Sequence, residues 1–94
     1  MKIVWFRSAI ADLEDTRAYI ANDDPEAARR VASAIFNAVD RLSDHPASGR
    51  PGRVPGTREL VVSRTPYVIP YRVRAGCVEI LRVFHARRRW PDRL

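Results

Sequence analysis

The first third of the chain changes from a strand-like to a helix-like pattern of apolar residues. Residues 2–7 form a short apolar run rich in β-branched and aromatic side chains, which is typical of a strand. Ser8 follows this run and is a residue type that often caps a helix. Small and apolar side chains then recur at helical spacing as far as Ile20, with charged residues between them. This pattern predicts a strand followed directly by an amphipathic helix.

A second amphipathic helix is predicted immediately after the first. Asp24 can cap it, and Pro25 fits its first position without the loss of a needed hydrogen bond. The helix is expected to end before residues 44–46. Its apolar stripe comprises Ala28, Val31, Ala32, Ile35, Phe36, Val39 and Leu42. Because the link at residues 22–26 is short, the two helices should form a hairpin.

The second half of the chain has the pattern of a loop followed by three strands. Residues 46–57 contain three prolines and three glycines, so we expect a long loop without regular structure. Strands are predicted at residues 58–62, 67–74 and 77–84, joined by short links into a meander. Pro70 cannot donate to a strand ladder and therefore predicts a bulge or a locally unpaired side. The last strand is apolar on both faces, which places it inside the sheet.

The order of these elements predicts an α+β fold of the form βααβββ. We expect the helical hairpin to pack on one face of a small, largely antiparallel, four-stranded sheet. Ninety-four residues suit a single domain spanning residues 1–94, and 46 % hydrophobic residues favour a folded globule. The apolar runs are too short to cross a bilayer, and Cys77 is the single cysteine. A cytoplasmic protein without a metal, a cofactor or a membrane partner is therefore expected.

The basic charge is concentrated in the C-terminal half. The chain has 17 basic and 11 acidic residues, for a net charge of +6, and Lys2 is its single lysine. Residues 1–46 hold six basic and eight acidic groups, whereas residues 47–94 hold eleven basic and three acidic groups. A GC-rich genome would also favour arginine, but the guanidinium group is well suited to phosphate and carboxylate partners. The distribution indicates a polyanionic or acidic partner for the C-terminal half.

Several segments, in order and at matching spacing, resemble the RelE/ParE superfamily of bacterial type II toxin–antitoxin toxins. They are DPEAA at 24–28, VPGTRELV at 54–61, PYVIPYRV at 66–73 and VEILRVFH at 78–85, followed by residues 88–91. The resemblance covers nearly the whole chain. It implies a small toxin that is neutralised by a cognate antitoxin with an acidic C-terminal region, in a toxin–antitoxin hetero-oligomer.

The two activities of this superfamily make different demands on the site. RelE-like members resemble ribosome-dependent mRNA endoribonucleases, whereas ParE-like members are associated with inhibition of DNA gyrase and are not themselves enzymes. Metal-free RNA cleavage needs proton-transfer groups and cations around the phosphate. His85 and Arg82 would be the catalytic residues of a nuclease. Glu59 could serve as a base if it faced the same cleft.

The usual nuclease set of this superfamily is incomplete here. Nuclease relatives typically place lysines on the first strand of the meander and a tyrosine or histidine near the C-terminus. Residues 58–62 contain no lysine, and no tyrosine follows Tyr71. We therefore favour a ParE-like gyrase inhibitor over an enzyme. The alternatives are a RelE-like endoribonuclease and a non-toxic module that binds nucleic acid or protein.

Under the favoured hypothesis the functional residues bind a target or the antitoxin. The candidates are Arg58, Arg72, Arg87, Arg88, Arg89 and Trp90. Trp90 has two interpretations, since it can anchor the C-terminal tail or stack on a base or an antitoxin side chain. A histidine at a strand end is often structural, so the role of His85 stays open. Tyr67 and Tyr71 are expected to pack in the core or against a partner.

Overall fold

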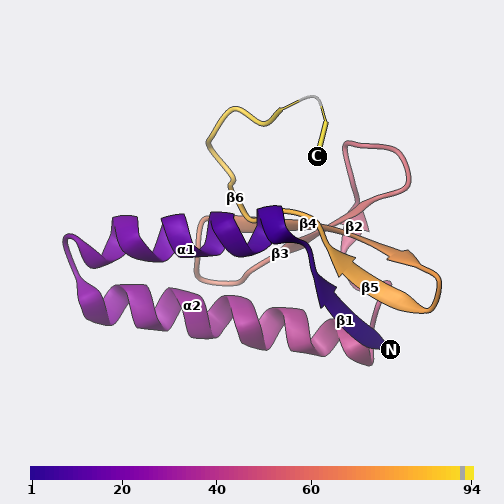
Figure 1. Ribbon diagram of the computed structural model, residues 1–94, viewed down its shortest axis with the longest axis horizontal. Helices are drawn as coiled ribbons and strands as arrows, with labels where there is room; N and C mark the ends of the chain where they lie inside the picture. Colours follow the sequence, from indigo (N-terminus) through magenta and orange to yellow (C-terminus); the bar gives the residue numbers. More distant parts are fainter. Residues whose placement is uncertain (92) are drawn as a thin grey trace.

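The N-terminal half consists of one strand and a helical hairpin (Figure 1). The structure, a computed structural model, describes residues 1–91 and 93–94. Strand β1 (Lys2–Trp5) leads into helix α1 (Arg7–Ala21), and helix α2 (Pro25–Asp40) runs back beside it before the short 3₁₀ helix η1 (Arg41–Ser43). The predicted hairpin of two helices is therefore confirmed.

The two helices begin in different ways. At α2 the carboxylate of Asp24 accepts the backbone N–H of Ala27 at 3.1 Å, as the sequence indicates. At α1 the N-cap residue is Phe6, and Ser8 lies inside the first turn, so the prediction of a Ser8 cap was wrong. The N–H of Phe6 still donates to the sheet, at the carbonyl of Ile80, and therefore the chain turns from strand to helix without a linker.

The C-terminal half builds a mixed sheet whose strand order is β1-β5-β4-β3-β2. Strand β1 pairs with β5 in parallel, and the other pairings are antiparallel. Strand β5 lies between β1 and β4, which confirms its predicted interior position. These strands are β2 (Arg50–Pro51), β3 (Arg58–Val61), β4 (Tyr67–Arg74), β5 (Cys77–Ile80) and β6 (Phe84–His85). The α+β class is confirmed, but the sheet has two short strands more than the four predicted.

The first additional strand, β2, lies in the segment expected to lack regular structure. It pairs with the first two residues of β3. The loop before it is fixed by Tyr71, whose buried hydroxyl donates to the carbonyl of Pro46 at 2.7 Å and accepts the N–H of Gly49 at 2.9 Å. A β-carbon at Gly49 would lie only 2.6 Å from the tyrosine ring, so this close approach requires glycine. The prediction failed here because a side chain from β4, 25 residues away, orders a loop rich in proline and glycine.

The second additional strand, β6, arises from a break in the predicted strand at residues 77–84. The backbone N–H groups of Leu81 and Arg82 both point to the carbonyl of Pro70, at 3.0 and 3.5 Å. Two residues thus face one, which is the bulge that Pro70 predicted. The bulge turns the chain, and β6 then pairs with the start of β4. The expectation of one uninterrupted strand was wrong for this reason.

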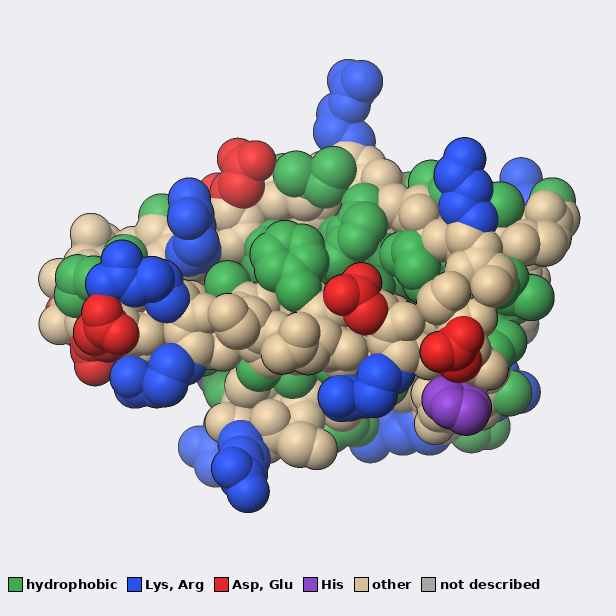
Figure 2. Space-filling view, turned by 90° about the horizontal axis from the view of Figure 1, so that it is seen from below, with side chains coloured by type: hydrophobic (Ala, Val, Ile, Leu, Met, Phe, Trp, Pro, Cys, Tyr) green, Lys and Arg blue, Asp and Glu red, His purple; other side chains and the backbone are tan. Residues whose placement is uncertain are grey.

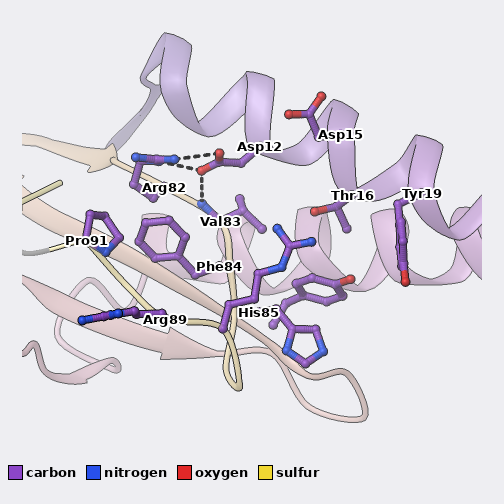
Figure 3. A pocket seen from close by; sticks show the side chains of 12 residues that line it. Asp12, Asp15, Thr16, Tyr19, Arg82, Val83, Phe84, His85, Arg89 and Pro91 are labelled. Carbon is purple, nitrogen blue, oxygen red and sulfur yellow. Dashed lines mark hydrogen bonds and ion pairs between the residues drawn. The ribbon is translucent and has the colours of Figure 1, made fainter.

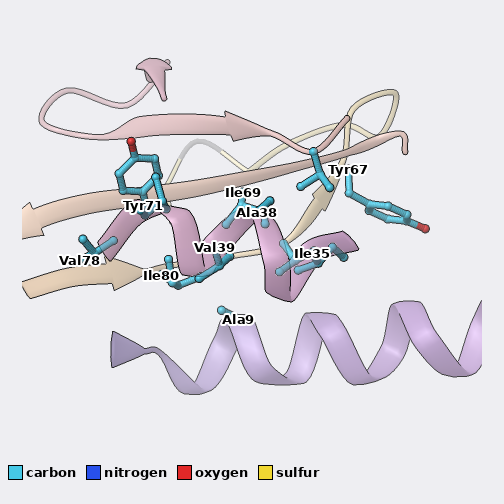
Figure 4. Packing of buried hydrophobic residues seen from close by; sticks show 12 residues of the cluster. Ala9, Ile35, Ala38, Val39, Tyr67, Ile69, Tyr71, Val78 and Ile80 are labelled. Atoms are coloured by element: carbon cyan, nitrogen blue, oxygen red, sulfur yellow. The ribbon is translucent and has the colours of Figure 1, made fainter. Parts of the chain in front are cut away.

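The core lies between the helical hairpin and one face of the sheet (Figure 4). Helix α2 contributes Ile35 and Val39, which are fully buried, whereas Ala9 is the one residue of α1 that reaches this state. Tyr67 and Tyr71 are also part of the core. Within the described residues, no helix has the length and apolar character needed to span a bilayer. Because α1 buries so little, its remaining faces are free to line the two surface sites described below.

Candidate functional site: a polar pocket beside the C-terminal tail

A pocket of about 410 Å³ opens between α1, β6 and the C-terminal tail, which we define as residues 86–91 (Figure 3). Helix α1 supplies one wall, the chain from the bulge to β6 supplies the floor, and the tail supplies the opposite wall. The lining residues are Asp12, Asp15, Thr16, Tyr19, Tyr67, Arg82, Val83, Phe84, His85, Arg88, Arg89 and Pro91. Four of the residues predicted from the sequence as functional therefore meet in one place: Arg82, His85, Arg88 and Arg89.

An ion pair joins the floor of the pocket to α1. The carboxylate of Asp12 accepts hydrogen bonds from Nε and Nη2 of Arg82, at 2.7 and 2.9 Å, and from the backbone N–H of Val83 at 3.0 Å. The hydrogen bond to Asp12 raises the pKa of Arg82, and burial opposes this only in part. The Arg82 guanidinium also lies 4.7 Å from the centre of the Phe84 ring. Arg82 is thus held by the protein itself.

His85 is one of the residues that line the pocket. Its Nδ1 accepts the backbone N–H of Arg87 at 3.1 Å, and its ring meets the ring of Tyr67 edge-on at 5.5 Å. Burial raises the pKa of Tyr67, with the positive charge of Arg88 acting in the opposite direction. Tyr67 therefore stays a neutral phenol at physiological pH. The lining of the pocket thus includes an imidazole, a phenol and the guanidinium of Arg88.

Two of the predicted binding residues lie outside this pocket. The Arg58 guanidinium donates to the backbone carbonyls of Ala47 and Gly49, at 3.3 and 2.8 Å, and so helps to hold the loop before β2. Arg72 forms an ion pair with Glu79 on the neighbouring strand β5. The structure does not bring either guanidinium to His85.

Glu59 does not line the pocket of His85 either, so the condition for a role as its base is not met. The side chain is 4 % exposed and its carboxylate binds Arg50 and Arg53. Burial alone would raise the pKa of Glu59. This pKa is nevertheless below the ordinary value of 4.5, because the carboxylate accepts hydrogen bonds from the backbone N–H of Arg53 and the side chain of Arg50, and because both arginines are positively charged. The ionised form of Glu59 is therefore the form that the fold stabilises.

Because folding lowers the pKa of Glu59, this residue should make the stability of the protein depend on pH in the acid range. A carboxylate whose pKa is lowered by folding stabilises the protein above its unfolded value of about 4.5, and the contribution is lost as the pH falls further. Glu59→Gln should lower the free energy of unfolding at pH 7 by about 1–3 kcal/mol, and by less at pH 3.5. Urea denaturation at both pH values measures this.

Glu26→Gln is a matched control for Glu59→Gln, since Glu26 pairs with Arg29 at a site where both side chains are about 70 % exposed. It should change the stability by less than about 0.5 kcal/mol at either pH. An equal effect of the two substitutions would show that burial of the Glu59 carboxylate has no such consequence.

Trp90 holds the tail against the body of the protein. Its indole ring lies 4.8 Å from the ring of Phe84, and the Arg53 guanidinium lies 3.4 Å from its centre on the loop side. The indole N–H points to the carbonyl of His85 at 3.4 Å. These contacts correspond to the anchoring interpretation of Trp90, and the two residues before it, Arg88 and Arg89, line the pocket.

The sequence alone did not identify the α1 wall of the pocket. Asp12, Asp15, Thr16 and Tyr19 lie on the polar side of an amphipathic helix, where charged and polar residues are normally solvated. Asp12 and Arg82 are 70 residues apart, and no local spacing connects them. One feature of the sequence could have indicated this wall. The first helix has fewer apolar residues in its stripe than the second, so more of its surface stays available to line a pocket.

A second, apolar groove of about 420 Å³ lies between α1 and α2. The rings of Trp5 and Phe36 pack 5.5 Å apart at its base, and Ile10 and Phe36 are both more than 40 % exposed. Glu14 and Arg17 form part of its rim. The space-filling view shows a continuous hydrophobic patch in the middle of the face seen from below, with acidic and basic side chains around it (Figure 2).

Comparisons with known proteins agree on the RelE/ParE superfamily of toxins. A family model described as the ParE toxin of the type II toxin–antitoxin system parDE matches residues 3–90. Y4kP of Sinorhizobium fredii, named as a candidate toxin, is 52 % identical over 91 residues, which cover 97 % of this chain and 94 % of that protein. Toxin RelE2 of Caulobacter vibrioides is 44 % identical over 87 residues, or 93 % of this chain and 97 % of that one.

A solved structure shares both the fold and the family. It belongs to the chromosomal ParDE toxin–antitoxin system of P. aeruginosa and has a TM-score of 0.80 at 34 % identity. The match covers 90 % of this chain and 95 % of the other. The resemblance stated from the sequence motifs is thereby confirmed. This chain belongs to the ParE toxin family of type II toxin–antitoxin systems.

Proposed function

We propose that this protein arrests growth by binding DNA gyrase, in the cytoplasm and without catalytic turnover, until a cognate antitoxin neutralises it. The observation that carries this proposal is the state of Arg82. A nuclease would need this guanidinium at the scissile phosphate, but two hydrogen bonds commit it to Asp12. His85 alone is an incomplete set for moving protons and stabilising charge. Membership in the ParE toxin family supports the same conclusion.

The tail wall of the pocket is the proposed contact with the target. Arg87, Arg88 and Arg89 are exposed and adjacent in sequence, and the second and third of them line the pocket. Exposed guanidinium groups attract acidic and phosphate surfaces over distances of about 10 Å at moderate ionic strength. Arg58 and Arg72, which bind intramolecular partners, support the fold in this proposal.

The apolar groove between the helices is the proposed contact with the antitoxin. Exposed aromatic and branched side chains beside a helical hairpin suit the apolar face of a partner helix. An acidic C-terminal region of the antitoxin would complement the net charge of +6. The two partners would then assemble into a hetero-oligomer.

A ribosome-dependent endoribonuclease is the second candidate function. It is favoured by the proximity of His85, Tyr67 and Arg88 in a pocket large enough for a nucleotide. The third candidate, a non-toxic binding module, predicts no growth arrest on induced expression. Growth arrest that a neighbouring acidic protein relieves would exclude it.

Two assays on one preparation test the proposal: gyrase supercoiling and cleavage of ribosome-bound message. We expect micromolar protein to inhibit supercoiling, and Arg88→Gln/Arg89→Gln to weaken the inhibition at least about tenfold because two charge-assisted contacts are lost. Arg29→Gln/Arg30→Gln, which removes two charges from α2, is the matched control. The opposite result would be that the protein cleaves message, that His85→Ala lowers this cleavage by about 10²-fold or more, and that supercoiling is unaffected. It would show an endoribonuclease in place of a gyrase inhibitor.

A further inference from the structure

Two contacts of Trp90 hold the C-terminal tail. The Trp90 ring packs against the Phe84 ring, with the ring centres 4.8 Å apart, and the Arg53 guanidinium lies 3.4 Å from the centre of the Trp90 ring. Phe84 belongs to β6, whereas Arg53 belongs to the loop between β2 and β3. Two segments that are distant in the sequence, β6 and the β2–β3 loop, therefore both contact the Trp90 side chain of the tail.

Arg53 is itself held in position by the buried carboxylate of Glu59. One carboxylate oxygen of Glu59 accepts both the backbone N–H of Arg53, at 2.9 Å, and its Nε, at 3.3 Å. The other oxygen accepts two hydrogen bonds from Arg50. Because Arg53 is bound through both its backbone and its side chain, its guanidinium presents a fixed face to Trp90. A freely rotating arginine would lose more side-chain entropy in making this contact.

The tail has its other contacts at its start. The N–H of Ala86 donates to the carbonyl of Pro66 at 2.7 Å, and the N–H of Arg88 donates to the carbonyl of His85 at 3.1 Å. Arg88 and Arg89 lie between the contact of Ala86 and those of Trp90, and both line the pocket. A tail fixed at both ends of this short segment keeps the two guanidinium groups at the pocket.

We propose that Glu59, Arg53 and Trp90 form a latch that positions Arg88 and Arg89 at the pocket. They are positioning residues, since Glu59 and Arg53 lie outside the pocket and act on it through Trp90. The consequence for target binding rests on the proposed function, whereas the latch itself is a property of the isolated protein. Residues 87–89 are already exposed, but their backbone is held at both ends; an open latch would free this backbone to adopt the extended conformation that a protease binds.

Limited trypsin digestion with mass spectrometry tests the latch on the full chain. Arg53→Ala and Trp90→Ala should each accelerate cleavage in residues 87–89 about tenfold, because loss of the cation–π contact favours the open state. Trp90→Phe keeps a ring and should stay within about threefold of the wild type. Arg29→Ala, which removes an exposed guanidinium from α2, is the matched control and should leave the rate unchanged. Cleavage after Arg30 inside α2 reports global unfolding in the same digest.

A double variant of Arg53 and Trp90 distinguishes a latch from general destabilisation of the fold. If Arg53 acts through Trp90, Arg53→Ala should add less than about twofold to tail cleavage in the Trp90→Ala background. An unchanged rate for Arg53→Ala, multiplicative effects in the double variant, or equal acceleration after Arg30 would each overturn the latch.

The supercoiling assay then separates the latch from the proposed function. Arg53→Ala should raise the concentration for half-inhibition several-fold. If the wild type does not inhibit gyrase while the trypsin results hold, the proposed function fails and the latch stands. If inhibition is found but tail cleavage does not respond to Arg53→Ala, the latch fails and the function stands.

Discussion

Phe36→Glu is expected to weaken binding of the cognate antitoxin by at least about 100-fold while the protein stays folded. Phe36 is 46 % exposed and packs against Trp5 in the groove between the helices. Aromatic anchors in such grooves commonly contribute 2 kcal/mol or more to binding, and a carboxylate there would also repel an acidic partner. The equilibrium dissociation constant, measured by calorimetry with the cognate antitoxin, gives the effect directly.

Val73→Glu is the matched control for Phe36→Glu. Val73 is 44 % exposed and lies near the end of the β4–β5 hairpin, outside the groove. The same charge at nearly the same exposure should change antitoxin affinity less than about threefold. Phe36→Leu should fall between the wild type and the glutamate variant, because an apolar side chain remains. If Phe36→Glu binds as tightly as Val73→Glu, the antitoxin uses a different surface.

The parts of the fold that depend on short sequence intervals were predictable. The apolar stripe from Ala28 to Leu42 specifies α2 and the 3₁₀ helix η1 that continues it, and Asp24 with Pro25 specifies the start of α2. Pro70 likewise indicated a bulge because it lacks a backbone donor. What the pattern did not show was the direction of the chain after the bulge, since that depends on Asp12, far away on α1.

The candidate site was predictable on one side only. The basic tail and His85 are visible in the sequence as a run of charge at the end of an apolar strand. The carboxylates that organise the site, Asp12 and Glu59, are not distinguishable by type from acids that remain in water. Glu59 is buried and Asp12 partly buried, and each accepts three or more hydrogen bonds; these features arise only when distant segments meet.

Asp12→Ala should destabilise the protein more than the other substitutions proposed on the pocket side. The change removes the acceptor of three hydrogen bonds and leaves the Arg82 guanidinium and the N–H of Val83, a buried residue, without their partner. Breaking a largely buried ion pair from one side commonly costs 3–5 kcal/mol, and the partial exposure of this pair reduces the expected loss to about 2–4 kcal/mol. Urea denaturation at pH 7 measures the change in the free energy of unfolding.

Asp15→Ala is the control for Asp12→Ala, since Asp15 lies on the same wall of the pocket one turn along α1. In the part of the chain that the structure describes, it forms no ion pair, and its replacement should change the stability by less than about 0.5 kcal/mol. Asp12→Asn should give an intermediate loss, because its amide oxygen can still accept the N–H of Val83. Equal stabilities of the two alanine variants would contradict the role of Asp12. A loss of 2–4 kcal/mol is a large fraction of the 5–15 kcal/mol typical of a domain, so the fold would depend on the contact that occupies the Arg82 guanidinium.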